Sequence, residues 1–278
     1  MRGSIGVAVG VLASIAAGSV FAAPGVEIKH AAARVTVIPE ARGDIAVSIT
    51  RPNPRLPLKV IRSGDSVIID GDLGLRSPHC RTMFGGPGVV VWGIGDVKFA
   101  DLPEVVVRVP RSARVGAAGA VFGVVNPGDS LELSNSGCGD WSVADQSGAL
   151  NIHQSGSGNV KAGSAGSADV GVSGSGDVSL HTVRVGLSTA IAGSGNVTAV
   201  SVSGPLHARI AGSGDIRIAG GAVTDMDVSV AGSGDVRFGG VAQSLNARIA
   251  GSGDVTVAKV TGSVTKHVAG SGDVNVGH

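Results

Sequence analysis

The chain contains no tyrosine, and aromatic residues make up only 3% of its 278 residues. Surfaces that bind sugars or nucleobases by stacking need exposed rings, so this composition argues against a stacking platform. Charged residues are also scarce, at 15%, and they nearly balance to a net charge of +1. The sequence shows no basic patch of the kind that nucleic acid requires, and we therefore expect no nucleic-acid partner.

Long apolar runs are missing except near the start of the chain. Residues 6–20 form one such run, preceded by Arg2 and followed by Phe21-Ala22. This pattern is typical of a secretory signal peptide, so residues 1–22 are predicted to be removed and the mature chain to be exported to the periplasm, the outer surface or the medium. A membrane anchor is the alternative, but the run is short and rich in Gly and Ala. After cleavage no transmembrane segment is expected, because no later run is long enough to span a membrane.

Cysteine occurs only twice, at Cys80 and Cys138. An oxidising compartment permits a disulfide, and a Cys80–Cys138 bridge would pin a Pro/Gly-punctuated loop to the entrance of the repeats described below. Two free thiols are the alternative. A metal site at His79 and Cys80 is disfavoured, because the sequence has no second Cys/His cluster with ligand spacing, and no cofactor is expected.

Glycine, by contrast, is abundant, with 46 residues and no Gly-X-Y period, which excludes collagen. Much of it falls in a motif, Ser/Ala-Gly-Ser-Gly-Asp/Asn-Val, that recurs every 18 to 20 residues. A degenerate copy with Cys138 in place of Ser precedes the others and ends at Asp140-Trp141. A fixed period of this length indicates a solenoid, in which each repeat is one coil. The Asp or Asn residues of the regular motifs are Asn159, Asp177, Asn196, Asp215, Asp235, Asp254 and Asp273.

Between the motifs, apolar and polar residues alternate with period two, which is typical of β-strands, and no segment has the period of a helix. Apolar residues also recur at the same place in successive coils, as at Val197, Ile216 and Val236. We predict an all-β fold, a single-stranded right-handed parallel β-helix with about 19 residues per coil over residues 134–278. The 20-residue coil is expected to absorb its extra residue at Gly220-Gly221.

Residues 23–133 carry shorter and less regular strands. Runs such as Val67-Ile68-Ile69 and Val105-Val106-Val107 are separated by turn signals rich in Gly, Pro, Asn and Asp. We predict that this part forms irregular coils or a cap of the same solenoid, because an open coil end exposes unpaired strand edges.

The repeat and its lead-in resemble the GIN-domain family of secreted bacterial proteins, whose members are described as autotransporter adhesin head domains. The resemblance rests on the signal peptide, on a Val-x-Val-Pro strand at Val107-Arg108-Val109-Pro110 and on the stacked motifs, and it is strongest over Ser134–Val276. It implies a right-handed β-helix and a secreted or cell-surface location. It supplies no catalytic residues.

The Gly-Ser-Gly-Asp/Asn motif is interpreted first as a structural turn. Glycine permits tight turns and close backbone approach, and Asp or Asn can hydrogen-bond backbone amides at a corner. A calcium site is the alternative, because stacked carboxylates at Asp215, Asp235, Asp254 and Asp273 would crowd like charges unless they are solvated, hydrogen-bonded or bridged by a cation. The known calcium solenoids use a different, nonapeptide spacing, however, and Asn replaces Asp in two coils.

Three functions remain open. The uniform repeat favours a structural or adhesive head module in the envelope or outside the cell, which binds an unidentified macromolecule and has no catalytic activity. A periplasmic protein that binds a ligand with its N-terminal half is the first alternative, and a groove lined by Trp92 and Phe84 would favour it. A carbohydrate-active enzyme on a β-helix scaffold is the second, but the sequence shows no paired carboxylates or nucleophile–base pair, so no catalytic residue is named.

The last coil raises the question of self-association. Val274 and Val276 continue the alternation of the interior coils, and we expect no charge or proline to blunt this edge. An uncovered coil exposes backbone groups and apolar core. We therefore predict a symmetric homodimer through the Asp273–Val276 strand, with another partner or simple tolerance of water as the alternatives.

Overall fold

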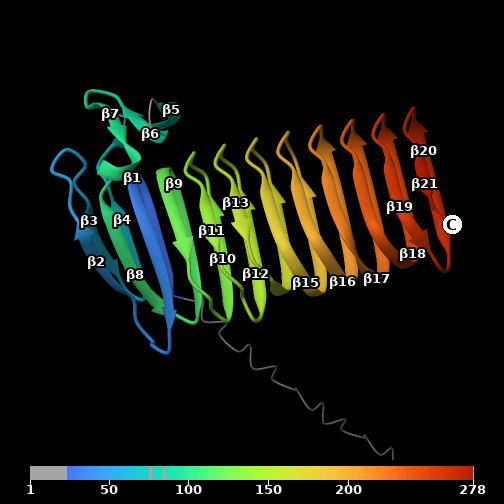
Figure 1. Ribbon diagram of the computed structural model, residues 1–278, viewed down its shortest axis with the longest axis horizontal. Coiled ribbons are helices and arrows are strands. Elements are labelled where there is room, and N and C mark those ends of the chain that lie inside the picture. The colour runs from blue at the N-terminus through green and yellow to red at the C-terminus, as the bar shows by residue number, and fades with distance from the viewer. Residues whose placement is uncertain (1–23, 75–77, 84–85, 278) are drawn as a thin grey trace, which may run out of the picture.

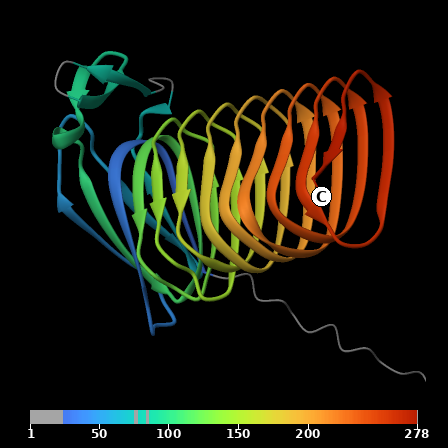
Figure 2. The ribbon, with the colours of Figure 1, turned by 45° about the vertical axis from the view of Figure 1, so that its right-hand side comes forward.

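The computed structural model describes residues 24–74, 78–83 and 86–277, and the predicted signal peptide, residues 1–22, lies outside them. The described residues fold into an all-β solenoid of about 9 turns, whose coils lie side by side along the long axis of the molecule (Figures 1 and 2). The predicted fold class, a β-solenoid with a spacing of about 19 residues, is confirmed. Among the described residues, no helix combines the length and the apolar character needed to cross a bilayer.

The coils of the C-terminal half pair in parallel and in register. Val197, Ile216 and Val236 occupy one inward-facing column, as the sequence predicts, and all three are fully buried. The 20-residue coil shifts its register between Ile218 and Ala222, where the extra residue was expected. The strands of this half are β10 (Ser130–Asn135), β11 (Trp141–Val143), β12 (Ala149–Gln154), β13 (Val160–Ala162), β14 (Ala165–Val172), β15 (Val178–Ile191), β16 (Val197–Gly212), β17 (Ile216–Gly232), β18 (Val236–Gly251), β19 (Val255–Val260), β20 (Val264–Gly270) and β21 (Val274–Val276).

The Gly-Ser-Gly corners bring the backbone of one coil against the backbone of the next. A Cβ atom added to Gly214 would lie 2.0 Å from the carbonyl oxygen of Gly195 in the preceding coil. A Cβ atom added to Gly253 would lie 2.1 Å from the carbonyl oxygen of Gly234. These distances are far shorter than a van der Waals contact, so the stacking of coils at this corner leaves room only for glycine.

In the N-terminal half, the order of the strands in the stack differs from their order in the chain. β1 pairs in parallel with β4 and β8 on one side and with β9 on the other. The first strand of the described chain is therefore held inside the stack, between segments that follow it in the sequence (Figure 1). These strands are β1 (Gly25–Glu40), β4 (Ser66–Asp70), β8 (Glu104–Pro110) and β9 (Ser112–Val125).

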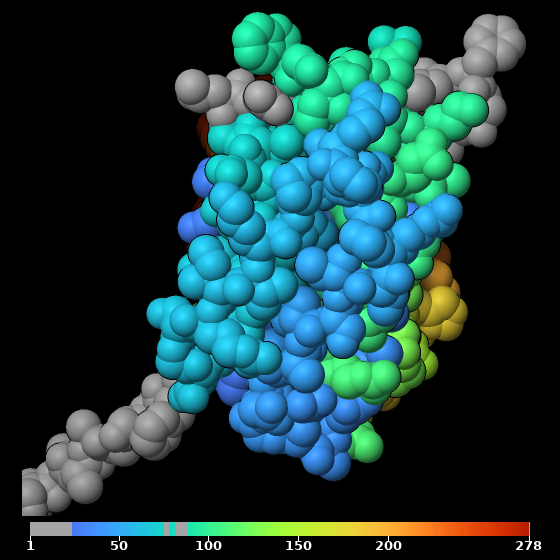
Figure 3. Space-filling model, turned by 90° about the vertical axis from the view of Figure 1, so that its left-hand side faces the viewer, coloured from blue at the N-terminus to red at the C-terminus, as the bar shows by residue number. Residues whose placement is uncertain are grey.

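Two antiparallel strands end the parallel winding at the N-terminal side. β2 (Ala46–Arg51) pairs with β8 and β3 (Lys59–Ser63) pairs with β4, each in the antiparallel direction. Figure 3 shows the blue and cyan segments of this region covering the end of the solenoid. The edge of the stack is thus covered by reversed strands and their connections instead of another coil.

A small antiparallel sheet leaves the solenoid altogether. It consists of β5 (His79–Met83), β6 (Gly86–Val91) and β7 (Gly95–Lys98), followed by the 3₁₀ turn η2 (Phe99–Asp101). Of the two expectations for this part, irregular coils or a cap, this stretch does not form coils, because its short strands pair with their immediate neighbours through hairpins. The sheet packs on the outer face of the solenoid through a separate apolar cluster of Ala32, Leu56, Leu73, Val89, Val91, Val97, Leu102 and Ala120.

A disulfide joins this sheet to the first repeat. Cys80 of β5 and Cys138, which replaces Ser in the degenerate motif, are bonded with their Cα atoms 5.7 Å apart and a sequence separation of 58. The bridge lies beside the second apolar cluster, against which both cysteines pack. The sheet is therefore held to the coils both by apolar contact and by a covalent bond.

The last described coil carries a charge on its inward side. Lys266 of β20 pairs with Ala247 of β18, which is fully buried, so Lys266 occupies an inward-facing column. Its Nζ donates a hydrogen bond to the carbonyl oxygen of Val274, at 2.7 Å. The expectation that no charged residue protects this strand edge is therefore wrong. Inward-pointing charges are a known protection against the edge-to-edge association of sheets. The homodimer through Asp273–Val276 stays a prediction.

Replacing Gly214 with alanine should destabilise the solenoid by about 1–3 kcal/mol, the usual cost of overpacking, because the new Cβ atom would collide with the carbonyl oxygen of Gly195. Gly220→Ala in the same coil is the matched control, since nothing lies within 4 Å of a Cβ atom there. Urea unfolding measures the free energy of unfolding of both variants. Equal stability of the two would contradict this explanation of the corners.

Replacing both cysteines with serine should weaken the attachment of the β5–β6–β7 sheet to the coils. The disulfide closes a loop of 58 residues, and loop closure of this length stabilises the folded state by about 4 kcal/mol. Hydrogen exchange should then show faster exchange in residues 78–83 and 86–98, with little change in β16 and β17. Faster exchange in β16 and β17, with the small sheet unaffected, would be the opposite of this expectation.

Replacing Lys266 with leucine should promote association through the last described coil, because an apolar side chain takes the place of a charge in the inward column. Light scattering over a concentration series measures the effect, and Lys259→Leu on the neighbouring strand β19 serves as the control. If the wild-type protein is already dimeric and K266L does not change its mass, Lys266 does not block this edge.

Candidate functional site

The Asp and Asn residues of the repeat form one continuous column. At each step the Oδ1 atom accepts a hydrogen bond from the backbone N–H of the Asp or Asn one coil later, at 2.8–3.0 Å. Only an acceptor oxygen is needed for this contact, which explains why Asn can replace Asp. The members of the column are Asp140, Asn159, Asp177, Asn196, Asp215, Asp235, Asp254 and Asp273.

This column has the contacts of a structural turn. The carboxylate of Asp215 lies 2.7 Å from the guanidinium of Arg217, and that of Asp235 lies 2.9 Å from Arg237, so these two charges are compensated within their own coils. Among the described residues, no group of three or more His, Cys, Asp or Glu side chains is placed to hold a metal ion. The stacked carboxylates are thus accommodated by backbone N–H groups and arginines, and we do not propose a calcium site.

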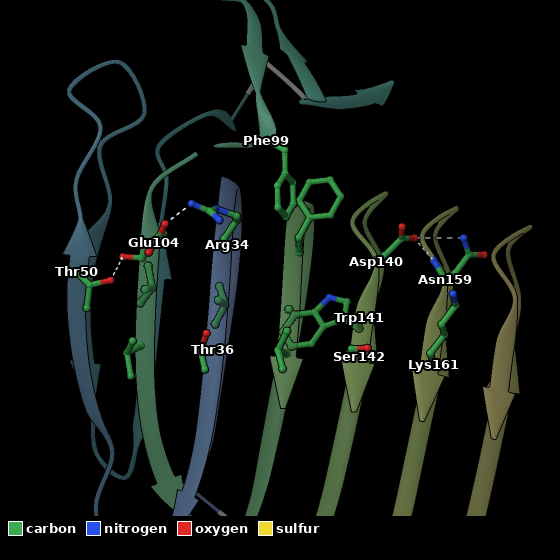
Figure 4. Close-up of a pocket in the computed structure, with 16 residues that line it drawn as sticks. Arg34, Thr36, Thr50, Phe99, Glu104, Asp140, Trp141, Ser142, Asn159 and Lys161 are labelled. Carbon is green, nitrogen blue, oxygen red and sulfur yellow. Dashed lines mark hydrogen bonds and ion pairs between the residues drawn. The ribbon is translucent and has the colours of Figure 1, made fainter. Parts of the chain in front are cut away.

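A groove of about 610 Å³ lies elsewhere, on the outer face of the sheet where the regular coils meet the N-terminal strands. Its residues come from β2, β8, β1, β9, β11 and β13, which follow one another across the sheet, and from η2 (Figure 4). The groove therefore crosses the strands and runs along the axis of the solenoid. The segment that follows the small sheet contributes Phe99 of η2 to the lining.

One row of outward-facing side chains lies on the side of the groove nearer the corners. Arg34 of β1 stands between Glu104 of β8, with which it forms an ion pair, and Phe122 of β9. Further along, the Oδ1 atom of Asp140 accepts hydrogen bonds from the backbone and side-chain amides of Asn159, at 2.8 and 3.2 Å. The Asp/Asn column of the repeats therefore continues directly from this side of the groove.

A second row, two residues further along each strand, forms the floor. Val106, Thr36, Val124, Ser142 and Lys161 are cross-strand neighbours in that order. Val124 is 48% exposed, which is unusual for a valine in the middle of a sheet and reflects the open groove above it. The floor thus alternates apolar side chains with hydroxyl groups and ends at an ammonium group.

Aromatic rings form one wall. Phe99 of η2 meets Phe122 edge to face, with ring centroids 5.1 Å apart and an interplanar angle of 84°. The guanidinium carbon of Arg34 lies 5.1 Å from the centroid of the Phe99 ring. Because η2 directly follows the small sheet, the position of Phe99 depends on how that sheet is attached.

Trp141 supports the floor from below. Its side chain is 2% exposed and belongs to the main core, and a Cβ atom on Gly123 would lie 2.2 Å from its ring. The indole therefore fills the space left by the missing side chain of Gly123 in the neighbouring coil. This pair fixes the spacing of β9 and β11 in the middle of the groove.

The two aromatic residues that the sequence suggested for a groove are Trp92 and Phe84. Trp92 is 77% exposed in the turn between β6 and β7 and does not line the groove, and Phe84 lies outside the described residues. The residues that line the groove were missed, because their proximity depends on β1 lying between β8 and β9. The only sequence signal is the break in the repeat at Asp140-Trp141, which marks where the regular coils begin.

The described groups with a shifted pKa lie on β3 and β4, and neither of them lines the groove. The pKa of Asp70 is lowered, chiefly because its Oδ1 accepts the backbone N–H of Asp72 at 2.8 Å. The pKa of Lys59 is raised by its hydrogen bond to the Asp72 carboxylate. Shifted pKa values often mark functional sites, but these two follow from the hydrogen bonds of an exposed turn.

Similar solved structures include two crystal structures. One, described as a "putative adhesin" from Parabacteroides distasonis, is 16% identical, with a TM-score of 0.51 and coverage of 91% of this chain and 92% of that chain. The other, described in the same words and from Bacteroides fragilis, is 15% identical over the same shares, with a TM-score of 0.45. At this identity the first similarity shows the fold alone. No curated protein matches the chain.

A family model matches the sequence directly. Its matches cover residues 69–222 and 186–277, and thus include the small sheet, β8, β9 and all the regular coils. Together they extend over more than half of the 278 residues. The chain therefore belongs to the family described as "Putative auto-transporter adhesin, head GIN domain".

Proposed function

We propose that this chain is an exported, non-catalytic head module that binds a macromolecule in the groove on the outer face of the N-terminal strands and the first coils. The observation that carries the proposal is the groove itself, whose volume of about 610 Å³ is typical of ligand sites in proteins. It lies where the repeat is interrupted and where charged, polar and aromatic side chains gather. The regular coils beyond it then serve as a stiff support that presents this end.

Export is supported by three independent features. The sequence predicts a signal peptide, the family is described by the word adhesin, and Cys80 and Cys138 are bonded. Disulfides persist mainly in oxidising compartments outside the cytoplasm. The mature chain is accordingly assigned to the periplasm, the outer surface or the medium, and its N-terminus is expected at Ala23.

The lining of the groove favours binding over catalysis. It contains no His and no Cys, so neither a Ser–His nor a Cys–His pair can be assembled from it. Its two carboxylates are already engaged, Glu104 with Arg34 and, at 3.6 Å, with Arg51, and Asp140 with the amides of Asn159. A carbohydrate-active enzyme on this scaffold is therefore the weakest of the three functions.

A small-ligand function in the periplasm remains the alternative, because most residues that line the groove belong to the N-terminal part, residues 23–133, for which ligand binding was considered. The two functions differ in the size of the ligand that the groove takes. A macromolecule should contact the whole length of the floor from Val106 to Lys161, whereas a small ligand needs only the part near Phe99 and Phe122.

Replacing Val124 with arginine should block the middle of the floor and lower binding to cell surfaces at least tenfold, because the longer charged side chain fills the groove. Val200→Arg is the matched control, since Val200 is a similarly exposed valine, at 51% against 48%, that does not line the groove. Flow cytometry with the labelled mature protein on bacterial and epithelial cells measures the binding. Equal loss in both variants, or no loss in V124R, would contradict the proposal.

A further inference from the structure

The backbone of the groove floor is not available to a ligand. β1 is paired on both sides, with β8 and β9, and β11 is paired with both β9 and β13. An extended peptide that binds by strand addition needs a free sheet edge, and these strands lie inside the sheet. A ligand on this floor therefore cannot add a strand to the sheet, and it meets the outward-facing side chains.

The polar side chains of the floor have unused hydrogen-bonding capacity. Among the described residues, Thr36, Ser142 and Lys161 make no side-chain hydrogen bond or ion pair, although all three line the groove. Thr50, at the opposite end, donates to the carbonyl oxygen of Glu104 at 3.3 Å and keeps its oxygen free to accept. The floor thus offers both donors and acceptors, spread over several strands that are spaced about 4.8 Å apart.

Apolar surface lies between these polar groups. Val106 and the half-exposed Val124 interrupt the polar floor, and the partly exposed rings of Phe99 and Phe122 stand beside it. A ligand that fits this pattern has apolar C–H faces and hydroxyl groups in alternation. Two of the few aromatic residues of the chain are thus placed in the groove, which the low aromatic content did not lead us to expect.

The charges of the groove favour a neutral ligand. The positive Arg34 is compensated by Glu104, and the lining holds two cationic residues, Arg34 and Lys161, against two carboxylates, Glu104 and Asp140. A polyanion would meet both carboxylates, and a polycation would meet Arg34 and Lys161, so either would be repelled at part of the groove.

From these features we propose that the groove binds a neutral glycan chain, laid along the axis of the solenoid across β8, β1, β9, β11 and β13. Hydroxyl groups of the glycan exchange hydrogen bonds with Thr36, Ser142 and Lys161, and its apolar ring faces lie on Val124 and against the phenylalanine wall. This inference rests on the proposed binding function and names the chemical class of its ligand.

The test is titration calorimetry of the mature protein with neutral oligomers of glucose, mannose and N-acetylglucosamine, from disaccharide to hexasaccharide. At least one series should bind, with an affinity that rises with length up to the hexasaccharide. Galacturonate hexamers and a Ser/Thr-rich hexapeptide should bind at least tenfold more weakly. Binding by none of the neutral series, or stronger binding by the acidic hexamer or the peptide, overturns the proposal.

Two variants test the side chains that carry it. Thr36→Val and Ser142→Ala remove one hydroxyl each, and each should weaken the hexasaccharide about threefold to tenfold, as the loss of one neutral hydrogen bond does. Thr256→Val, on β19 in the same outward row but outside the groove, is the control and should have no effect. Equal affinity of all three variants overturns the assignment of the floor.

The ligand class and the binding function can fail separately. If cell-surface binding is lost in V124R but survives periodate oxidation of the cells and is removed by protease, the groove binds a protein, and the glycan proposal is wrong while the binding function stands. If V124R binds cells like the wild-type protein, the groove is not the binding site and both proposals are wrong.

Discussion

The fold depends on stacking each coil directly on the next at the Gly-Ser-Gly corner. The carbonyl oxygen of one corner occupies the space where a side chain of the next would begin, as between Gly195 and Gly214. Beside this contact, each Asp or Asn accepts the backbone N–H of its successor, so a hydrogen bond also holds each corner on the next. Once this register is set, the inward columns of Val, Ile and Leu follow, because a strand side chain can face only one of two sides.

The register of the repeats could be predicted from the sequence, but little of the arrangement of the N-terminal half could. The period, the column of Val197, Ile216 and Val236 and the place of the extra residue at Gly220-Gly221 all follow from repetition, which reports which residues are equivalent. Repetition says nothing of a segment that occurs once. The insertion of β1 between β8 and β9 joins residues far apart in the chain, and Lys266 is recognised as inward only when its partner Ala247 is known.

The groove exists because the repeat is broken. A uniform solenoid presents the same convex or flat face at every coil. Such a face offers a ligand the same contacts at each coil, so no single position along it is preferred. Here the small sheet leaves the stack, and the chain returns through Phe99, which stands beside strands whose outward residues differ from coil to coil. The disulfide between Cys80 and Cys138 ties the small sheet to the degenerate motif where the repeats begin, close to the strands that form the groove.

The position of β1 inside the stack also sets how the molecule bears load. To pull β1 out, a force on the N-terminal side must break its ladder with β9 together with those with β4 and β8. A force on the C-terminal side meets β20 and β21, which are each paired with one earlier strand, and can peel the coils off in sequence. Among the described strands, β1 is therefore held by more neighbouring strands than β20 or β21, and it lies in the part of the solenoid that carries the groove.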